Sequence, residues 1–495
     1  MNVNFQKINL NGFETPLVLI GVLEAAKEDP STSGLIEVAK EVIEKGDFHG
    51  KIGDLSLLYS QGDIKAERIL LVGIGNKDKL SPESIRKAVG IASRTARDLD
   101  VKKVSIFLDS FSRDVVEVTE ATEALVQGMM MGSFQNLAYR TKNLEKYKHI
   151  EELTIISPDA DNIVMKQGIE SGKIIAEAVN FCRELAWGPA NYITPTKLAN
   201  EAIRFEKELG IKTTIFDREK AEEIGLTSFL AVARGTKEPP KFIIMEHGAD
   251  KEGVDTVALI GKAITFDSGG ISIKPSQGME RMKADMTGGA VVIAVMEAVA
   301  KLDLDLHVVG IVPATDNMPS GTAYHPGDII TSYSGITIEV ISTDAEGRMV
   351  LNDALTYAAK HYKPKAMFDF ATLTGAMMIA LGEHAIGYFS NHDFVVDKLE
   401  EASETSGERV WRMPLWEVYD EQLKSDVADF KHTGGRPAGS ITAARFLSQF
   451  TLDVPWAHLD IAGAMEQSSD KYYNPKGSKG PAVRLIVDLL RNWKK

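Results

Sequence analysis

Apolar and polar residues alternate along this chain in runs that are typical of strands and helices in turn. In the first third, residues 69–75 and 104–108 are short apolar runs that end at turn-forming residues, as buried strands do. Residues 121–131 have the pattern of a helix. Ser81 followed by Pro82 predicts another helix start, because serine caps a helix and proline fits its first turn. This alternation predicts a compact α/β domain that ends near residue 160.

A long helix is predicted at residues 164–186. It is followed by Gly188-Pro189-Ala190-Asn191, a cluster that breaks regular structure. We therefore interpret residues 161–187 as a connecting helix between a smaller N-terminal α/β domain, residues 1–160, and a larger C-terminal α/β domain, residues 188–495.

Strand-like and helix-like segments also alternate in the larger domain. Strands are predicted at residues 242–246, 257–266, 306–312, 336–341 and 367–372, and helices at 288–301 and 348–361. Acidic residues, lysines and paired glycines gather at strand ends between about residues 260 and 380. Sites of open α/β sheets form at the carboxyl ends of strands, so we expect the function to reside here.

The composition narrows the class of protein. A chain of 495 residues predicts two to three domains, and a hydrophobic share of 44% is enough for large cores. The net charge of −14 argues against nucleic-acid binding, because an acidic protein is repelled by a polyanion. Cys182 is the single cysteine, which excludes an internal disulfide and a cysteine zinc site. No apolar run approaches 18 residues, which predicts a cytoplasmic protein without a membrane segment.

Candidate chemistry lies at three junctions between a strand and a helix. Lys262 and Asp267 lie in and after a buried strand, and Asp285, Asp344 and Glu346 precede helices. Each has an ordinary explanation by itself, since aspartate caps helices and forms turns. Together, four converging carboxylates would repel one another and raise their pKa values, and divalent cations remove that conflict.

Two cations a few ångströms apart can hold and acidify a water, and oxygen ligands suit Mg²⁺, Mn²⁺ and Zn²⁺. Lys262 could be a ligand only as a neutral amine, and burial and neighbouring cations would lower its pKa. Lys274 and Arg348 would stay charged, as groups that stabilise an oxyanion do. Two-metal sites also perform phosphoryl transfer, so a two-metal phosphoesterase is an alternative.

Other chemical motifs are weak or absent. None of the ten histidines has the H-E-x-x-H spacing, and the chain has no G-x-S-x-G motif. His458 lies in an apolar run, and we interpret it as a core residue. Gly73-Ile-Gly75 lacks the third glycine of a dinucleotide fingerprint, which leaves the N-terminal domain as a possible binding or assembly module.

Several ordered motifs resemble one family. Ser342-Thr-Asp-Ala-Glu-Gly-Arg348 is similar to the signature of the leucyl (cytosol) aminopeptidases, the M17 metallopeptidase family. The same family is matched, in the same order, by the segments 266–270, 316–320, 371–375 and 456–463. The chain departs from the family pattern at Ser342, where asparagine is usual, and at Asp316, where glutamate is usual.

The resemblance implies a site and a reaction. One cation would be held by Asp267, Asp344 and Glu346, and the other by Lys262, Asp267, Asp285 and Glu346. Lys274 would polarise the scissile carbonyl, and Arg348 would hold a bicarbonate ion as general base toward a metal-bridged water. The implied substrate pocket consists of Met282, Thr372, Leu373, Gly375, Ala462 and Met465.

The resemblance also implies a fold and partners. It predicts a macro-like N-terminal domain and a peptidase domain with a central mixed sheet. The expected activity is removal of N-terminal leucine or another bulky apolar residue from short peptides. The expected cofactors are two divalent cations per subunit, Mn²⁺ or Zn²⁺ with Mg²⁺ as a further candidate. The expected assembly is a homohexamer, a dimer of trimers.

Overall fold

The computed structural model describes residues 1–24, 40, 42–59 and 64–494. The chain divides into two compact units, Met1–Asn180 with Gln467–Lys476, and Phe181–Glu466 with Gly477–Lys495. Helix α5 (Asn162–Trp187) covers most of the predicted connecting segment 161–187, and the unit boundary lies inside it. The division into residues 1–160, 161–187 and 188–495 stays a prediction.

The first unit is built on a six-stranded sheet in the order β1-β6-β5-β2-β4-β3. Neighbouring strands are parallel except β3, which runs antiparallel to β4. The strands are β1 (Asn2–Lys7), β2 (Val18–Leu23), β3 (Leu55–Tyr59), β4 (Arg68–Gly75), β5 (Lys103–Phe107) and β6 (Glu152–Ser157). The strands predicted at 69–75 and 104–108 are therefore confirmed as β4 and β5.

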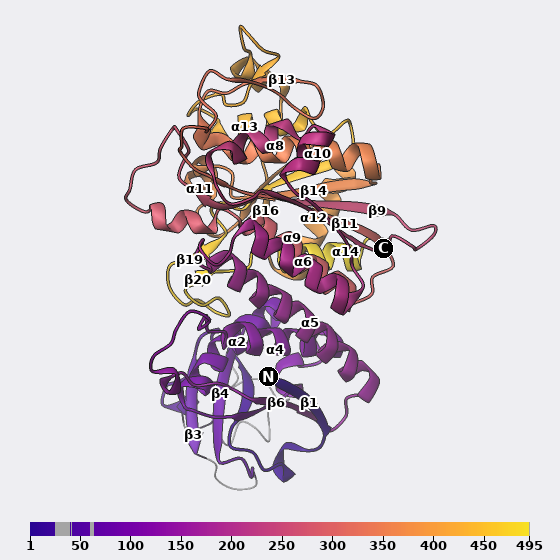
Figure 1. The fold of residues 1–495 in the computed structure, drawn as a ribbon. Coiled ribbons are helices and arrows are strands. Elements are labelled where there is room, and N and C mark those ends of the chain that lie inside the picture. The colour runs from indigo at the N-terminus through magenta and orange to yellow at the C-terminus, as the bar shows by residue number, and fades with distance from the viewer. Residues whose placement is uncertain (25–39, 41, 60–63, 495) are drawn as a thin grey trace. The chain divides into compact units, whose positions relative to one another are not determined.

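Two long helices, α2 (Pro82–Asp98) and α4 (Val118–Gly132), pack on one face of this sheet (Figure 1). Ser81 caps α2 as predicted, since its side chain accepts a hydrogen bond from the Ser84 amide. Gly90 of α2 is needed for packing: a Cβ there would lie 2.6 Å from the Tyr473 Cα. Glycine thereby lets the segment Gln467–Lys476, distant in sequence, reach this helix within the same unit.

The second unit is built on a nine-stranded mixed sheet, ordered β16-β15-β18-β14-β9-β11-β8-β7 with β10 paired to β11. The central strands β18, β14, β9 and β11 are parallel, and β8 runs antiparallel to both β11 and β7. The strands are β7 (Lys212–Phe216), β8 (Lys241–His247), β9 (Thr256–Gly261), β10 (Ala263–Asp267), β11 (His307–Asn317), β14 (Ala366–Ala371), β15 (Ile386–Ser390), β16 (Val410–Arg412) and β18 (Trp456–Asp460). The predicted fold class, a smaller and a larger α/β domain with a central mixed sheet in the larger one, is confirmed.

Helices cover both faces of this second sheet, with α8, α10 and α13 on one side and α6, α9 and α14 on the other (Figure 1). The helices of the unit are α6 (Pro195–Leu209), α7 (Arg218–Ile224), α8 (Thr227–Val232), α9 (Thr287–Lys301), α10 (Glu346–Tyr362), α11 (Gly375–Leu381), α12 (Asp393–Ser406), α13 (Gly439–Ser448) and α14 (Val483–Arg491). The helices predicted at 288–301 and 348–361 correspond to α9 and α10. Within the described ranges, no helix has the length and apolar character that crossing a bilayer demands.

Two strand predictions need correction. The run 257–266 is not continuous, because the chain breaks between β9 and β10 at Lys262, whose carbonyl accepts a hydrogen bond from the Gly289 amide instead of a neighbouring strand. The strand predicted at 336–341 is shorter, β13 (Thr337–Glu339). It lies outside the central sheet, between β12 (Ile329–Thr331) and β17 (Phe430–Lys431). Periodicity cannot reveal such breaks, since the partners that cause them are remote in sequence.

Candidate dinuclear metal centre

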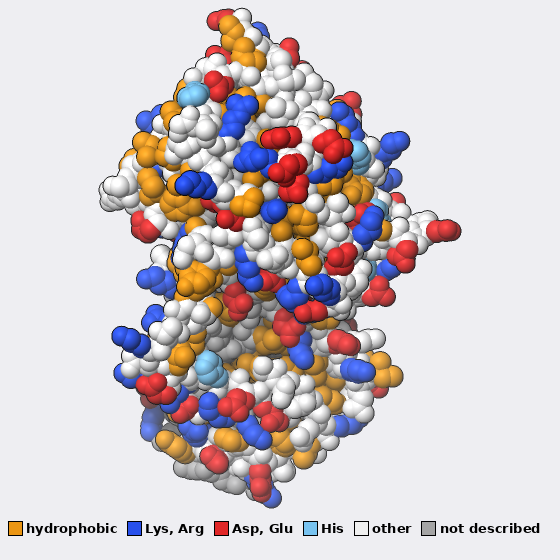
Figure 2. Space-filling model, in the orientation of Figure 1, with side chains coloured by type: hydrophobic (Ala, Val, Ile, Leu, Met, Phe, Trp, Pro, Cys, Tyr) orange, Lys and Arg blue, Asp and Glu red, His pale blue; other side chains and the backbone are white. Residues whose placement is uncertain are grey.

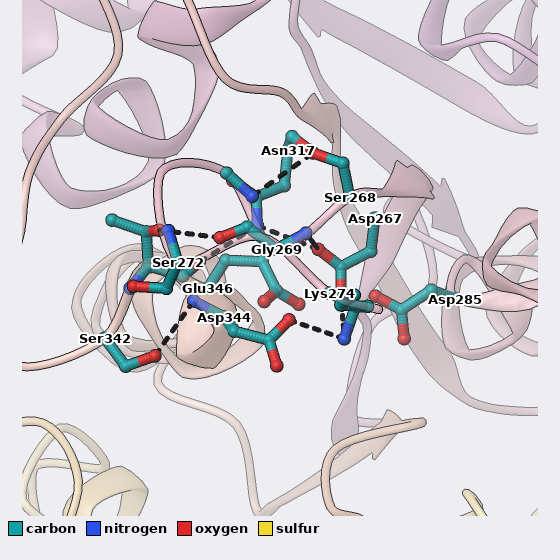
Figure 3. A network of polar contacts seen from close by, with 12 residues as sticks. Asp267, Ser268, Gly269, Ser272, Lys274, Asp285, Asn317, Ser342, Asp344 and Glu346 are labelled. Atoms are coloured by element: carbon teal, nitrogen blue, oxygen red, sulfur yellow. Dashed lines mark hydrogen bonds and ion pairs between the residues drawn. The ribbon is translucent and has the colours of Figure 1, made fainter. Parts of the chain in front are cut away.

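The predicted charged residues come from separate elements and meet beside the ends of β9 and β10. Lys262 lies between these strands, and Asp267 is the last residue of β10. Asp285 follows the 3₁₀ helix Met279–Ala284. Asp344 lies in the 3₁₀ turn Thr343–Ala345, and Glu346 begins α10. Figure 3 shows that their carboxylates point toward one another from these different segments.

The inner half of the cluster surrounds Lys262. Its Nζ lies 2.7 Å from an Asp285 oxygen and 2.8 Å from a Glu346 oxygen, and it donates to the Thr372 carbonyl at 3.1 Å. The Lys262 and Glu346 side chains are only 3% and 2% exposed. Gly347 makes room for the lysine, because a Cβ there would lie 2.7 Å from the Lys262 Cε.

The outer half surrounds Lys274. Its Nζ lies 2.8 Å from an Asp267 oxygen and 2.5 Å from an Asp344 oxygen. The Lys274 side chain is 22% exposed and that of Asp344 is 38% exposed, so this half faces solvent. The other Asp267 oxygen is held from behind, by the Gly269 amide at 2.9 Å and the Asn317 side-chain amide at 2.8 Å.

Burial and mutual repulsion set the electrostatics of the cluster. Burial alone would lower the pKa of Lys262, but Asp285 and Glu346 outweigh it and raise the pKa above its usual range. Burial and then Glu346 raise the pKa of Asp267 to about 6. The carboxylates by themselves therefore hold Lys262 as an ammonium. The sequence predicts a lowered pKa for Lys262 on the assumption that cations lie next to the amine. The carboxylates alone shift the pKa of Lys262 in the opposite direction.

The donor set fits divalent cations. Asp267, Asp344 and Glu346 each offer an oxygen, and these three oxygens lie within 4.8 Å of one another. The Glu346 Oε2 atom is buried without a hydrogen-bond partner among the described residues, a costly arrangement that a cation would relieve. Carboxylate oxygens with an amine suit Mn²⁺, Mg²⁺ or Zn²⁺. Lys262 and Asp285 lie next to Glu346 and can complete a second position.

Neutral residues that the sequence reasoning passed over hold the turn that carries Asp344. The Thr343 carbonyl accepts hydrogen bonds from the Asn317 side-chain amide at 2.9 Å and from the Tyr324 hydroxyl at 3.1 Å. Thr343 also exchanges hydrogen bonds with Ser272, its amide donating to the Ser272 Oγ and its Oγ1 accepting from the Ser272 amide. Asn317 ends β11 at the same sheet edge as Asp267, and this position is the signal that could have revealed it.

Arg348 lies two residues after Glu346 on α10 and is buried. Its Nη1 donates to the His432 carbonyl at 2.7 Å, and its buried Nε has no hydrogen-bond partner in the part of the chain that the structure describes. Burial lowers the pKa of Arg348 to about 10, while Glu346 and Asp460 oppose this shift. The guanidinium is therefore charged at neutral pH and has donor capacity left for an anion.

Asp460, at the end of β18, joins several predicted substrate-pocket residues. Its Oδ1 accepts hydrogen bonds from the Leu373 and Ala462 amides, both at 3.2 Å, and its Oδ2 accepts from the Thr374 hydroxyl at 2.6 Å. Thr372, next in the same loop, donates its hydroxyl to Asp285 at 2.7 Å. The loop is thus fixed between Asp460 and the inner half of the site.

Three further residues are predicted for the substrate pocket, and they are linked to the charged cluster less directly. Gly375 is exposed at the start of α11. The carbonyl of the half-buried Met282 accepts a hydrogen bond from the Asp285 amide at 3.3 Å. Met465 is buried, and its carbonyl accepts from the Lys479 amide at 3.0 Å. His458 is a core residue as interpreted, fully buried with its Nδ1 2.6 Å from Asp369.

Fold and site together define a two-unit α/β protein with a histidine-free carboxylate and lysine cluster suited to two divalent cations. The family model "Cytosol aminopeptidase family, catalytic domain" matches residues 180–487, and the N-terminal domain model of the same family matches residues 19–143. The chain therefore belongs to the cytosol aminopeptidase family. By class, this makes it a metal-dependent aminopeptidase.

Relatives and solved structures agree with this assignment. A probable cytosol aminopeptidase of Roseiflexus castenholzii is 42% identical over 97% of this chain and 96% of the relative. One of Chlorobaculum tepidum is 44% identical over 90% and 91%. A tomato leucine aminopeptidase mutant superposes with a TM-score of 0.89 at 33% identity, covering 99% and 96% of the chains. The bottromycin maturation enzyme BotP in complex with Mn gives 0.86 at 30% identity, covering 97% and 100%.

Proposed function

We propose that this protein removes leucine and other bulky apolar residues from the N-terminus of short peptides, with two divalent cations in its site. The observation that carries the proposal is the convergence of Asp267, Asp344 and Glu346 within 4.8 Å, beside the ion pairs of Lys262 with Asp285 and Glu346. When bound, the cations would supply positive charge and an acidified bridging water. Asp267 and Glu346, between the other groups, would serve both positions.

The protein's own charged groups have distinct tasks in this proposal. Lys274 lies at the solvent-facing side of the cluster, where a peptide carbonyl can approach, and its ammonium would stabilise negative charge on the carbonyl oxygen. The acidic site attracts the substrate's free α-amine, which limits cleavage to the first residue. This division of labour explains why one lysine is sealed and the other partly exposed.

Arg348 would hold the bicarbonate ion, whose chemistry is that of a general base. The support is its buried, charged guanidinium with an unpartnered Nε, adjacent to Glu346 at the start of the same helix. A small planar anion matches the fork of donors that arginine presents. The manganese in the BotP complex supports Mn²⁺ as a cofactor candidate for this chain as well, with Zn²⁺ and Mg²⁺ as the others.

The apolar preference rests on Met282, Leu373, Ala462 and Met465, with Thr372 and Gly375 completing the pocket. Leu373 and Ala462 share one carboxylate oxygen of Asp460, which places their backbones together. Methionine side chains adapt their shape to apolar groups of different size. A panel of aminoacyl anilides tests this preference, and faster cleavage of charged residues than of leucine would contradict it.

The central test replaces Asp344 by alanine. Asp344 is the most exposed of the proposed ligands, so its removal should leave the fold intact while it abolishes hydrolysis of leucine anilide and weakens Mn²⁺ binding. The measurements are anilide hydrolysis and calorimetric titration of metal-stripped protein with Mn²⁺, Zn²⁺ and Mg²⁺. Asp393→Ala, at an aspartate with an 86% exposed side chain, is the matched control. Near wild-type activity of Asp344→Ala would show that the site is assigned wrongly.

A cytoplasmic homohexamer, a dimer of trimers, is part of the same proposal. Ile379, Trp416 and Val418 are 88%, 65% and 67% exposed in the single chain, and large apolar side chains of this kind are favoured at subunit interfaces. Light scattering measures the assembly, and a monomer at micromolar concentration would contradict it. On the face that Figure 2 displays, acidic and basic side chains of the described residues are intermixed, which gives nucleic-acid binding no support there.

A further inference from the structure

His432 lies directly after β17 and is completely buried, although it belongs to none of the charged groups of the site. Strand β17 pairs in parallel with β13, and the His432 amide continues this pairing by donating to the Glu339 carbonyl at 3.1 Å. The chain that leaves β13 leads through Ser342 into the turn that carries Asp344. His432 is therefore placed beside the entry to the proposed ligand segment.

The imidazole makes three polar contacts with the backbone, and two of them are with that entry. Its Nε2 lies 2.8 Å from the Ser342 carbonyl oxygen, and its Nδ1 lies 3.2 Å from the Ile341 amide. The Nδ1 atom also lies 3.2 Å from the Glu339 carbonyl oxygen, which already accepts the hydrogen bond of the His432 amide. A carbonyl can only accept and a backbone amide can only donate, so a proton on Nε2 makes hydrogen bonds of both contacts with the entry, whereas a proton on Nδ1 would serve only the Glu339 carbonyl. Burial, followed by repulsion from Arg348, lowers the pKa of His432 to about 4, which keeps the ring neutral at physiological pH.

The backbone of the same residue reaches the far end of the segment. The His432 carbonyl accepts the hydrogen bond of the Arg348 guanidinium at 2.7 Å. One residue therefore binds Ser342 with its side chain and Arg348 with its main chain, and the proposed ligands Asp344 and Glu346 lie between these two points. The next carbonyl, that of Thr343, is held independently by Asn317 and Tyr324.

We propose that His432 is a positioning residue, which fixes the backbone before Asp344 through its Nε2–H bond to Ser342 and aligns it with Arg348 through its own carbonyl. Supports of this kind tune metal affinity although they do not touch the metal. The inference rests on the proposed function in one respect, because the experiment that tests it measures cation binding.

Three substitutions separate the hydrogen bond from simple packing. His432→Gln keeps a donor near the position of Nε2, His432→Asn keeps an acceptor near the position of Nδ1, and His432→Leu keeps neither. All three retain the main-chain carbonyl that binds Arg348. Calorimetric titration of the metal-stripped proteins with Mn²⁺ should show affinity weakened about 10- to 100-fold in the Leu and Asn variants, and restored to within a few-fold of wild type in the Gln variant.

Controls make each outcome decisive. Leu399→Ala removes a buried side chain of α12 and reports what lost stability alone does to Mn²⁺ binding. Wild-type affinity in folded His432→Leu, or equal weakening of the Gln and Asn variants, overturns the inference and leaves the proposed function intact. A wild-type chain that binds no Mn²⁺ contradicts the proposed function itself.

A neutron diffraction structure of the wild type tests the same bond without any substitution. It should show deuterium on Nε2 and none on Nδ1 of His432. A proton on Nδ1 alone means that the bond to Ser342 does not exist, and the positioning role is then wrong whatever the variants do.

Discussion

The two lysines of the site have similar carboxylate neighbours but meet water differently. Lys262, with Asp285 and Glu346, is sealed in the protein, whereas Lys274, with Asp267 and Asp344, lies at a partly open edge. A sealed ion cluster cannot release one partner without leaving a buried charge, while an exposed one can exchange its partner for water or substrate. The difference separates a group that holds the site together from a group that can act on a substrate.

Helix α10 extends the comparison to carboxylates. Glu346 at its start and Asp353 in its middle are both completely surrounded by protein. Burial would raise the pKa of Glu346, but Lys262 and then Lys274 lower it below its usual value. Among the described residues, no lysine lies within ion-pair distance of Asp353. Its carboxylate accepts hydrogen bonds from the Phe229 and Tyr333 amides, and burial raises its pKa to about 7. Both groups are buried, so the nearby lysines account for the opposite direction of the pKa shift of Glu346.

The largest expected effect separates the two lysines by stability. Lys262→Met leaves Asp285 and Glu346 buried without their cation and should lower the free energy of unfolding of the metal-free protein by about 3–5 kcal/mol. Lys274→Met should lower it by about 1 kcal/mol or less, because its pairs are partly solvated. Guanidinium unfolding, with hydrogen exchange in α10 as a local measure, checks both. Equal losses of unfolding free energy in the two variants would show that the sealed and the open half do not differ in stability.

A smaller effect concerns Asp353 and pH. Its folded pKa is raised, so its contribution to stability is fully present below about pH 4 and is lost as the pH rises through about 7. Within that window this group should reduce the free energy of unfolding by about 1.4 kcal/mol per pH unit. The measurement is unfolding of wild type and Asp353→Asn across this range, with the exposed Asp393→Asn as control. An unchanged slope in Asp353→Asn would mean that the group is ionised like an exposed one.

The smallest expected effect tests Asp460, a carboxylate that accepts hydrogen bonds from the neutral groups of Leu373, Thr374 and Ala462. Asp460→Asn keeps an acceptor for the Leu373 and Ala462 amides but weakens the bond from the Thr374 hydroxyl. Residues 372–375 should then be held less tightly in position. We expect this to raise KM for leucine anilide about 10-fold, or about 1.4 kcal/mol, with little change in Mn²⁺ affinity. Kinetics and metal titration of one preparation provide the measurement. A loss of Mn²⁺ affinity larger than the change in KM would place Asp460 with the inner half instead.

The apolar pattern and the motifs predicted the two α/β parts, most central strands and the elements that carry each candidate ligand. They could predict these because strand and helix periodicity is local, and because Asp and Glu before a helix are readable in one segment. They failed at Lys262, where Gly289 from the next helix takes the hydrogen bond that would have continued the strand. They also missed Asn317, Tyr324 and His432, which are neutral and act through hydrogen bonds to groups that are remote in sequence.

The sequence by itself determined which charged residues this protein contains and at which strand ends they occur, since these properties depend on neighbours along the chain. Only the tertiary structure decided that Lys262 is sealed and Lys274 open, because exposure depends on helices and loops that arrive from elsewhere. It also decided the charge of each group. A pKa responds to burial and to charges a few ångströms away, and these distances exist only after Asp285, Glu346 and Asp267 have been brought around the lysines.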